Sequence, residues 1–477
     1  MQKLRLTLCA ALAFTTLSIS AQDGWTDLFN GKDLSGWTQK GGKAKYSVED
    51  SSIVGETVAG TPNSFLCTEK DYGNFILELD FKVDPRLNSG VQVRSECFDH
   101  PTQVEWKGKT IKISANRVHG YQVEIDPDAA RKRMWTGGIY DEARRFWLFP
   151  GQLGGDEKQF SRQGLVIFNT NDWNHLRVVA DGASIRTYLN NVLCAHIEDS
   201  LTPKGFIALQ VHEVGKDVSR EGMQVRFKNI RLKELPAAAP KTETPANTLT
   251  DEEKQAGWEL LWDGKTTDGW RSAKSDNFPT RGWTIKNGVL TVHENGGAES
   301  VGGGDIITRK RYSNFELLVD FRLTPGANSG IKYFVQPNLD PVTGTGAKAS
   351  AGSAIGCEFQ ILDDARHPDA KLGRNGNRTI GSLYDLIPAA KSKQPNAIGE
   401  WNTAHIIVRG SHVEHWLNGQ KVVEYDRNSD AFRKRVAQSK YKNIPNFGEW
   451  ADGHILLQEH GNEVSFRNVK IRVPAGK

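Results

Sequence analysis

The chain has 477 residues, of which 38% are hydrophobic and 25% are charged, and its formal net charge is +4. These values are typical of a soluble protein with two or three well-packed domains. So small a net charge argues against nucleic acid or a membrane surface as a partner.

The first residues predict a secretory signal peptide over residues 1–21. Lys3 and Arg5 precede an apolar run, and small residues lead to Ala21, after which cleavage is expected. The run is too short to anchor the mature chain, and no later stretch is long enough to span a bilayer. We therefore expect a periplasmic or secreted protein.

Residues 24–235 predict a first domain built from strands. Residues 75–81 and 178–185 alternate between apolar and polar side chains. Turn signals such as Asn30-Gly31 punctuate the strands at short intervals, and no helix longer than a turn or two is expected. The pattern predicts an all-β antiparallel sandwich, and a length of about 210 residues favours a large two-sheet jelly roll.

Several of these strands carry polar groups at alternate positions, which period-two alternation places on one face. If the strands are neighbours, one sheet has a polar, concave, ligand-binding face and a core-forming face. A merely solvated face is the alternative, and the recurrence of Gln and His in the second half argues against it. The residues are Gln92 and Arg94, Gln122, Glu124 and Asp126, and Gln210 and His212.

Residues 236–250 predict a Pro/Ala-rich linker whose spaced prolines favour an extended tether. Thr250 and Glu253 have the spacing of a capping box, which predicts a short helix at the start of a second domain, residues 251–474.

The second domain repeats the first in order. Its polar strands carry Glu358 and Gln360, and Gln458 and His460, whereas Phe334 stands where Arg94 stands. A repeat this long is a duplicated domain and not a solenoid unit of roughly 20–50 residues. Matched strings include Gly36-Trp37 and Gly269-Trp270, Tyr72-Gly73-Asn74-Phe75 and Tyr312-Ser313-Asn314-Phe315, Asn88-Ser89-Gly90 and Asn328-Ser329-Gly330, and Phe227-Lys228-Asn229-Ile230 and Phe466-Arg467-Asn468-Val469.

Four cysteines remain after the expected cleavage: Cys67, Cys97, Cys194 and Cys357. None occupies equivalent places in the two halves, whereas a disulfide framework would duplicate with its domain. We expect free thiols, with one bridge inside the first half left open.

The strings LFNGKDLSGW, GYQVEID and GGIYDEARRFWL of the first half, and EFQILDD, IGSLYDL, WLNG and LQEHG of the second, resemble the 3-keto-disaccharide hydrolase domain family. The resemblance covers nearly the whole chain after residue 21. It implies two tandem concanavalin A-like jelly rolls. It also implies a substrate whose sugar C3 hydroxyl a partner dehydrogenase has oxidised.

A C3 ketone acidifies the C2 hydrogen, so a base can remove that proton and eliminate the group at C1. Later addition of water makes the result a net hydrolysis. Such a site needs a base with a tuned pKa and a cation or hydrogen-bond donor at the enolate oxygen. It does not need the carboxylate pair of ordinary glycosidases.

The polar strands supply candidates for these roles, and the sequence leaves open which domain is catalytic. The base in the first domain is Glu124 or His212, with Arg94 or Tyr140 at the oxyanion; the second domain offers Glu358, His460 and Tyr384. Substrate contacts are expected from Gln122, Asp126, Arg144, Arg145, Trp147, Gln210, Gln360 and Gln458. A divalent cation held by Asp363 and His367 is a further hypothesis, and no nucleotide cofactor is expected.

Two other functions are open. A conventional endo-glucanase of the same fold has a strand with Glu-x-Asp-x-x-Glu; Glu124-Ile125-Asp126 begins this pattern, but Pro127 interrupts it. A glycan-binding protein without catalysis needs sugar contacts and no base.

Overall fold

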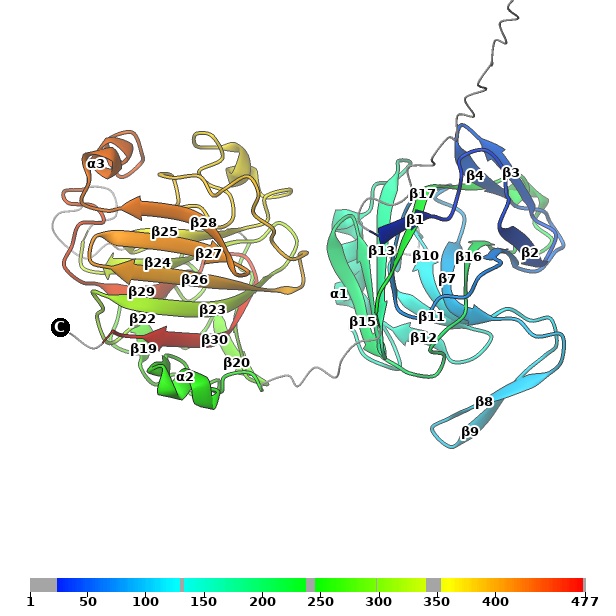
Figure 1. Cartoon of the computed structure of the whole chain (residues 1–477), viewed down its shortest axis with the longest axis horizontal. Coiled ribbons are helices and arrows are strands. Elements are labelled where there is room, and N and C mark those ends of the chain that lie inside the picture. The colour runs from blue at the N-terminus through cyan, green and yellow to red at the C-terminus, as the bar shows by residue number, and fades with distance from the viewer. Residues whose placement is uncertain (1–23, 129–132, 237–244, 297, 340–352, 475–477) are drawn as a thin grey trace, which may run out of the picture.

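A computed structural model describes residues 24–128, 133–236, 245–296, 298–339 and 353–474. The expected signal peptide and the linker residues 237–244 lie outside the described residues. Within them the chain forms two β-sandwiches in tandem, as Figure 1 shows, which confirms the all-β prediction. No helix of the described part is both long and apolar enough to cross a bilayer.

The larger sheet of the first domain has eight strands. They are β1 (Trp25–Asp27), β3 (Lys45–Glu49), β4 (Ser52–Glu56), β6 (Phe75–Val83), β13 (Asn174–Asp181), β14 (Ser184–Leu189), β15 (Val192–Glu198) and β17 (Gln224–Glu234). Their order is β15-β14-β13-β6-β17-β4-β3, with β1 paired to β17.

The facing sheet of the first domain has seven strands. They are β2 (Trp37–Gly41), β5 (Ser64–Thr68), β7 (Ser89–Glu96), β10 (His119–Ile125), β11 (Ile139–Glu142), β12 (Phe146–Phe149) and β16 (Phe206–Val211). Their order is β12-β11-β10-β7-β16-β5-β2. The hairpin of β8 (Thr102–Trp106) and β9 (Lys109–Ile113) projects from this domain (Figure 1).

The second domain repeats this plan with fewer strands. Its larger sheet has the order β20-β21-β30-β23-β26-β27-β28, with β18 paired to β30, and its smaller sheet has the order β19-β22-β29-β24-β25. The bounds are β18 (Trp258–Leu260), β19 (Trp270–Ser272), β20 (Trp283–Lys286), β21 (Val289–Val292), β22 (Ile306–Thr308), β23 (Phe315–Leu323), β24 (Asn328–Gln336), β25 (Ile355–Leu362), β26 (Trp401–Arg409), β27 (His412–Leu417), β28 (Gln420–Asp426), β29 (His454–Leu457) and β30 (Val464–Arg472).

Each sandwich has its own hydrophobic core between its two sheets. In β6, Phe75, Leu77, Leu79 and Phe81 are fully buried, and the residues between them are half-buried. This alternation matches a strand with one face on the core. One face of such a strand therefore points inward. The outer face of the smaller sheet of the first domain carries polar groups and also a separate apolar cluster of Phe65, Cys67, Val118, Phe206 and Ala208.

The helices are few: α1 (Glu157–Ile167), α2 (Asp251–Gln255), α3 (Asp430–Ala437) and the short 3₁₀ turns η3 (Val218–Arg220) and η4 (Pro368–Lys371). The predicted capping box of α2 is confirmed. The expectation of no longer helix is wrong for α1, which Asp156 caps by accepting from the Gln159 amide. Phe160 and Ile167 bury its one apolar side.

The four cysteines of the described residues are free thiols, as expected. Cys67, Cys194 and Cys357 are buried. Burial raises the pKa of each of these thiols to about 12, so they serve as small apolar side chains.

A contact joins the two domains at the turn before β26. Glu400 Oε1 accepts hydrogen bonds from Arg186 Nη1 at 3.0 Å and from the Tyr188 hydroxyl at 2.5 Å. The Leu193 amide donates to the Ile398 carbonyl at 2.8 Å. The Ile398 side chain packs against both hydrophobic cores. The domains are therefore in direct polar and apolar contact, beyond their covalent linker.

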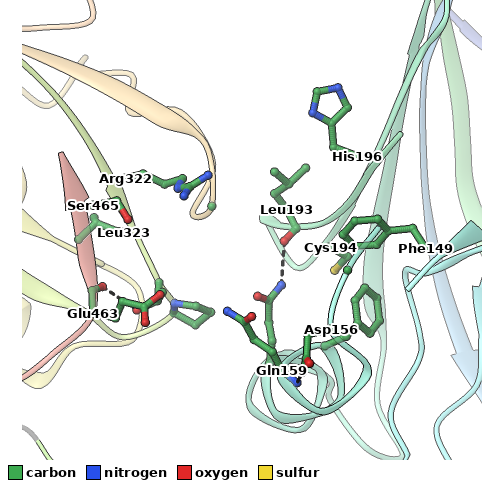
Figure 2. A pocket seen from close by; sticks show the side chains of 16 residues that line it. Phe149, Asp156, Gln159, Leu193, Cys194, His196, Arg322, Leu323, Glu463 and Ser465 are labelled. Carbon is green, nitrogen blue, oxygen red and sulfur yellow. Dashed lines mark hydrogen bonds between the residues drawn. The ribbon is translucent and has the colours of Figure 1, made fainter. Parts of the chain in front are cut away.

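A cavity of about 350 Å³ lies between the domains. Figure 2 shows Leu193 and His196 of the first domain on one side and Arg322 and Glu463 of the second domain on the other. The polar strand residues predicted from the sequence do not line it. We therefore assign this cavity to the joint between the domains.

Glu400→Ala is expected to loosen this joint. The buried Tyr188 hydroxyl loses its partner, and breaking such a charge-assisted contact costs about 2 kcal/mol of docking free energy. Small-angle scattering measures the result as a larger radius of gyration, with Glu424→Ala as an exposed control on β28. An unchanged scattering profile in Glu400→Ala would show that the contact does not hold the domains together.

Candidate active site

The polar strands lie in the smaller sheet of each domain, and their polar side chains point away from the core. In β10, Tyr121 and Val123 belong to the hydrophobic core, so Gln122 and Glu124 lie on the opposite, outer face. The strands are neighbours in the order β11-β10-β7-β16. The outer face is therefore continuous across these four strands.

The strand register brings predicted side chains of the first domain together on this face. Gln122 lies opposite Tyr140, and Glu124 lies opposite Gly90. Gly90 in turn lies opposite Gln210. A side chain at position 90 would collide with Gln122 at 2.6 Å, because Gln122 covers the space above the glycine.

Hydrogen bonds cross this face in one direction and end on Glu124. Ser95 Oγ donates to Gln92 Oε1 at 2.6 Å, and Gln92 Nε2 donates to Gln122 Oε1 at 2.6 Å. Gln122 Nε2 and Asn88 Nδ2 then donate to the Glu124 carboxylate at 2.9 Å and 2.7 Å. Burial raises the pKa of Glu124 to about 7, although both amide donors oppose the rise.

A cavity of about 680 Å³ opens at the end of this face, where β7 begins and β10 and β16 end. Asn88, Asp126 and His212 line it, and Arg133 Nη2 lies 2.5 Å from the Asp126 carboxylate. This volume falls in the range of small-molecule sites, roughly 300–1,000 Å³. The first domain therefore offers a ligand-sized space that reaches Glu124 through Asn88.

Glu124→Gln is expected to stabilise the first domain at alkaline pH. The folded-state pKa of Glu124, about 7, lies above its ordinary value of 4.5, so stability falls as the pH rises through this interval. Glutamine mimics the protonated acid, and Asn88 Oδ1, which has no partner in the described part of the chain, can accept from it. Urea unfolding should show a gain of up to about 3 kcal/mol at pH 8 that disappears near pH 4. A pH-independent difference would contradict this assignment.

The predicted oxyanion role of Arg94 is wrong. Arg94 has a φ of 47° in a bulge where the register of β7 shifts, and Phe334 has a φ of 55° at the same place. A bulge breaks period-two alternation, so Gln92 stays on the outer face while Arg94 turns inward. Its guanidinium donates to the carbonyls of Gly73 and Gly182, each at 2.8 Å, and so links the two sheets.

The structure also contradicts substrate contacts by Arg144 and Arg145. Both are buried, and the Asp141 carboxylate lies between them, 2.8 Å from Arg144 Nε and 2.5 Å from Arg145 Nε. Arg145 continues to Asp199 at 2.7 Å. A buried network of this kind holds the loop after β11 in place and leaves no guanidinium for a sugar.

Trp147 lies in β12, next to β11. It is half-buried and meets Trp135 and Tyr140 edge-on, with ring centroids 4.3 Å and 5.5 Å apart. Its role as a sugar platform stays a prediction.

The outer face of the second domain carries an ion pair. Lys332 of β24 lies opposite Glu358 of β25, and Lys332 Nζ lies 3.7 Å from Glu358 Oε2. Their exposed fractions are 5% and 4%. Tyr384 lies beside them, since its backbone amide donates to the Glu358 carbonyl at 3.0 Å.

Acidic groups keep Lys332 charged despite its burial. Burial lowers the pKa of Lys332, but Glu358, Asp305 and Glu299 outweigh it and raise the pKa above its ordinary value. Lys332 Nζ donates to Ser353 Oγ, which donates to Asp305, both at 2.5 Å. Burial raises the pKa of Glu358, and Lys332 opposes this rise.

Amide and imidazole groups surround this pair. Gln458 Nε2 donates to Glu299 at 3.0 Å, and the amide of Gln360 lies 3.2 Å from that of Asn328. His460 Nε2 lies 3.4 Å from Asn328 Nδ2, and its buried Nδ1 has no partner among the described residues. The face thus combines a carboxylate, an ammonium, an imidazole and amides.

The sequence shows the same residue types in both halves, but the register shows that the carboxyl and the amide have exchanged places. Next to the bulge, the first domain places two amides opposite each other, Gln92 and Gln122. The second domain places an ammonium opposite a carboxylate there, Lys332 and Glu358. The equivalent residues, first domain then second, are Gln92 and Lys332, Gln122 and Glu358, and Glu124 and Gln360.

The predicted metal ligands have other partners. The Asp363 carboxylate accepts from the Gly326 amide at 2.8 Å and pairs with Arg366 at 3.3 Å, so it holds a turn. His367 Nδ1 accepts from the Asp369 amide at 3.2 Å. The metal hypothesis at Asp363 and His367 therefore does not fit the structure.

A cluster of three possible metal ligands in the described chain is formed by His412, Glu414 and Glu424 on β27 and β28. Lys421 Nζ lies 3.3 Å and 2.6 Å from the two glutamates. Lys421 thus offsets part of the negative charge of this half-exposed cluster, which we interpret as a surface ion-pair group.

Reasoning from the sequence missed Lys332 and Glu299. Lys332 comes two residues after Gly330 and so shares the outer face, a signal that a comparison with Gln92 could have found. Glu299 lies outside any strand, and only the tertiary fold brings it to Gln458.

A 3-keto-disaccharide hydrolase of Bacteroides thetaiotaomicron is 36% identical over 236 residues, which are 46% of this chain and 78% of the relative. Two crystal structures of proposed glycosyl hydrolases from Parabacteroides distasonis are 30% and 27% identical, with TM-scores of 0.41 and 0.33. They cover 48% and 45% of this chain, and 98% of each of those proteins is covered.

Two jelly-roll sandwiches with buried carboxyl groups on their outer faces, and a hydrolase among the relatives, define a carbohydrate-active hydrolase. The model of the 3-keto-alpha-glucoside-1,2-lyase-like domain matches residues 24–233 and 257–472. The chain belongs to this family, in two tandem copies, and the resemblance drawn from its sequence strings is confirmed.

Proposed function

We propose that the chain cleaves the glycosidic bond of 3-keto-glycosides by elimination, and that the second domain carries out this reaction. The observation that carries the proposal is the buried pair of Lys332 and Glu358 on a face shared with Gln458 and His460. Family membership and the name of the Bacteroides relative support the substrate class.

Glu358 would act as the base. Its carboxylate takes the C2 proton, and the electrons of the broken C–H bond form a C2–C3 double bond as the C3 ketone becomes an enolate. The ammonium of Lys332 lies beside Glu358. It would stabilise the negative charge that develops on the C3 oxygen of the enolate. The enolate then collapses, a C1–C2 double bond forms, and the C1–O bond breaks.

His460 would protonate the departing oxygen, because its ring is half-buried and one buried nitrogen has no partner among the described residues. Gln360 and Gln458 would bind sugar hydroxyls. The first products are a 2-hydroxy-glycal enone and the free aglycone. Addition of water across the C1–C2 double bond returns a 3-keto sugar, so the sum of the two steps is hydrolysis.

Two features suit Glu358 to this role. Burial strengthens it as a base by raising its pKa, and the neighbouring Lys332 ammonium opposes that rise by favouring the carboxylate form. Both charges are also buried, and an ammonium acts more strongly on a developing anion in a low-dielectric interior than in water.

The substrate must come from a reaction that oxidises the C3 hydroxyl of a glycoside. We therefore propose a sugar 3-dehydrogenase as functional partner. The apolar run from Leu6 to Ile19, with small residues up to Ala21, supports the proposal that the chain is exported to the periplasm or the medium.

A paired assay tests this function. The purified full chain is incubated with a 3-keto-glucoside and with the matching unoxidised glucoside, and aglycone release and enone absorbance are followed. Release from the 3-keto-glucoside alone, with deuterium entering C2 in heavy water, supports elimination. Release from the unoxidised glucoside would indicate a conventional hydrolase, and release from neither would indicate a binding protein.

A further inference from the structure

The outer face of the first domain is built for hydroxyl groups rather than for an enolate. Gln92 stands in place of Lys332, and Gln122 in place of Glu358. The carboxyl of this face, Glu124, receives its hydrogen bonds from two neutral amides. The ammonium that the proposed elimination needs is therefore replaced by an amide.

The arginines beside this face are already ion-paired. Arg117 Nη2 lies 2.5 Å from Glu142, and Arg133 Nη2 lies 2.5 Å from Asp126. Each guanidinium is thus neutralised by a carboxylate. Little positive charge therefore remains on these arginines to stabilise an anionic intermediate.

Gln210 is the strongest sign of a ligand. It is fully buried, and neither its amide oxygen nor its amide nitrogen has a partner among the described residues. The equivalent Gln458 donates to Glu299. A buried polar group without a partner costs about 1–3 kcal/mol, which a ligand with hydroxyl groups would recover.

Gln210 lies next to the ligand-sized cavity. His212 lines that cavity and follows Gln210 by two residues, just past the end of β16 at Val211. Asn88 also lines it. Asn88 Nδ2 donates to Glu124, whereas Asn88 Oδ1 has no partner among the residues that the structure describes. Open donors and acceptors therefore extend from the cavity onto the sheet.

We propose that the first domain is a binding site for an unoxidised sugar unit, which it holds through Gln210, Asn88 and Glu124 without cleaving it. This inference rests on the proposed function, because it assigns the chemistry to the second domain. A glycan held by the first domain would keep its oxidised end near the second at a high effective concentration.

Calorimetric titration of the full chain carrying Glu358→Gln tests the site, with maltose, cellobiose and trehalose as probes. This background blocks the proposed turnover, so binding is measured whether or not the proposed reaction is right. We expect at least one disaccharide to bind, and Gln210→Leu to weaken that binding at least tenfold. Gln103→Leu, the same change at an exposed glutamine of β8 outside the site, should weaken it less than twofold.

The fold of Gln210→Leu is checked by its melting temperature, which should not fall, because leucine removes an unpaired buried amide. Asn88→Ala is a second variant at the same site and should weaken binding at least threefold. Binding that is absent for all three sugars, or that survives both changes, would overturn the site. Turnover that persists in Glu358→Gln and disappears in Glu124→Gln would overturn it too, by making the first domain catalytic.

Discussion

Glu358→Gln in the full chain is expected to lower kcat for 3-keto-glucoside cleavage about 10³-fold. Glutamine keeps the shape of the side chain but cannot take the C2 proton, and a positioned general base contributes roughly 10²–10⁴-fold. Stopped-flow or steady-state measurement of enone formation gives kcat. Deuterium exchange at C2 should slow by the same factor, because it reports the same proton transfer.

Glu259→Gln is a suitable control, since Glu259 is exposed on β18 and lies outside the site. Its kcat should match that of the unmodified chain. A Glu358→Gln protein that retains full exchange and cleavage would exclude this carboxyl as the base, and the search would move to His460.

Lys332→Gln gives the second domain the glutamine that the first domain has at the equivalent position, Gln92. We expect kcat to fall about 10²–10³-fold, as it does when one hydrogen-bond donor to an oxyanion is lost. It also removes the cation that holds down the pKa of Glu358. The ascending limb of kcat/KM should therefore move to higher pH, because the base is the ionised carboxylate.

The pH profile separates this role from a purely structural one. Loss of stability alone would lower the amount of active protein without moving the limb of the profile. Lys286→Gln, a change at an exposed lysine, serves as the control for charge. An unshifted profile with full activity in Lys332→Gln would contradict the assignment of Lys332.

Local signals predicted the architecture well. The alternation of β6 and β23 requires only that one side of each strand be apolar, and the duplicated strings place the same strands in both halves. The capping box follows from the spacing of Thr250 and Glu253. The free thiols of the described cysteines follow from the unequal distribution of cysteines between the two halves. Helix α1 was not predicted because its apolar side is narrow: Phe160 and Ile167 are set among polar residues.

The shared outer face of the polar strands was predicted, but not all of the residues that lie on it. Period two put Gln122, Glu124 and Gln210 on one face, and the structure puts them there. It failed at Arg94, where a bulge reverses the alternation, because a bulge is set by the ladder with the neighbouring strand.

By itself the sequence determined the duplication, the all-β class, the family and the strands that bear polar groups, because each of these depends on the order of residues along one strand or on identity between the halves. The tertiary structure alone decided which groups face one another. Pairing across strands is a long-range property, so only the register could show Lys332 beside Glu358 where the first domain sets Gln92 beside Gln122. That single facing pair distinguishes the domain we propose as catalytic from the domain we propose as a binding site.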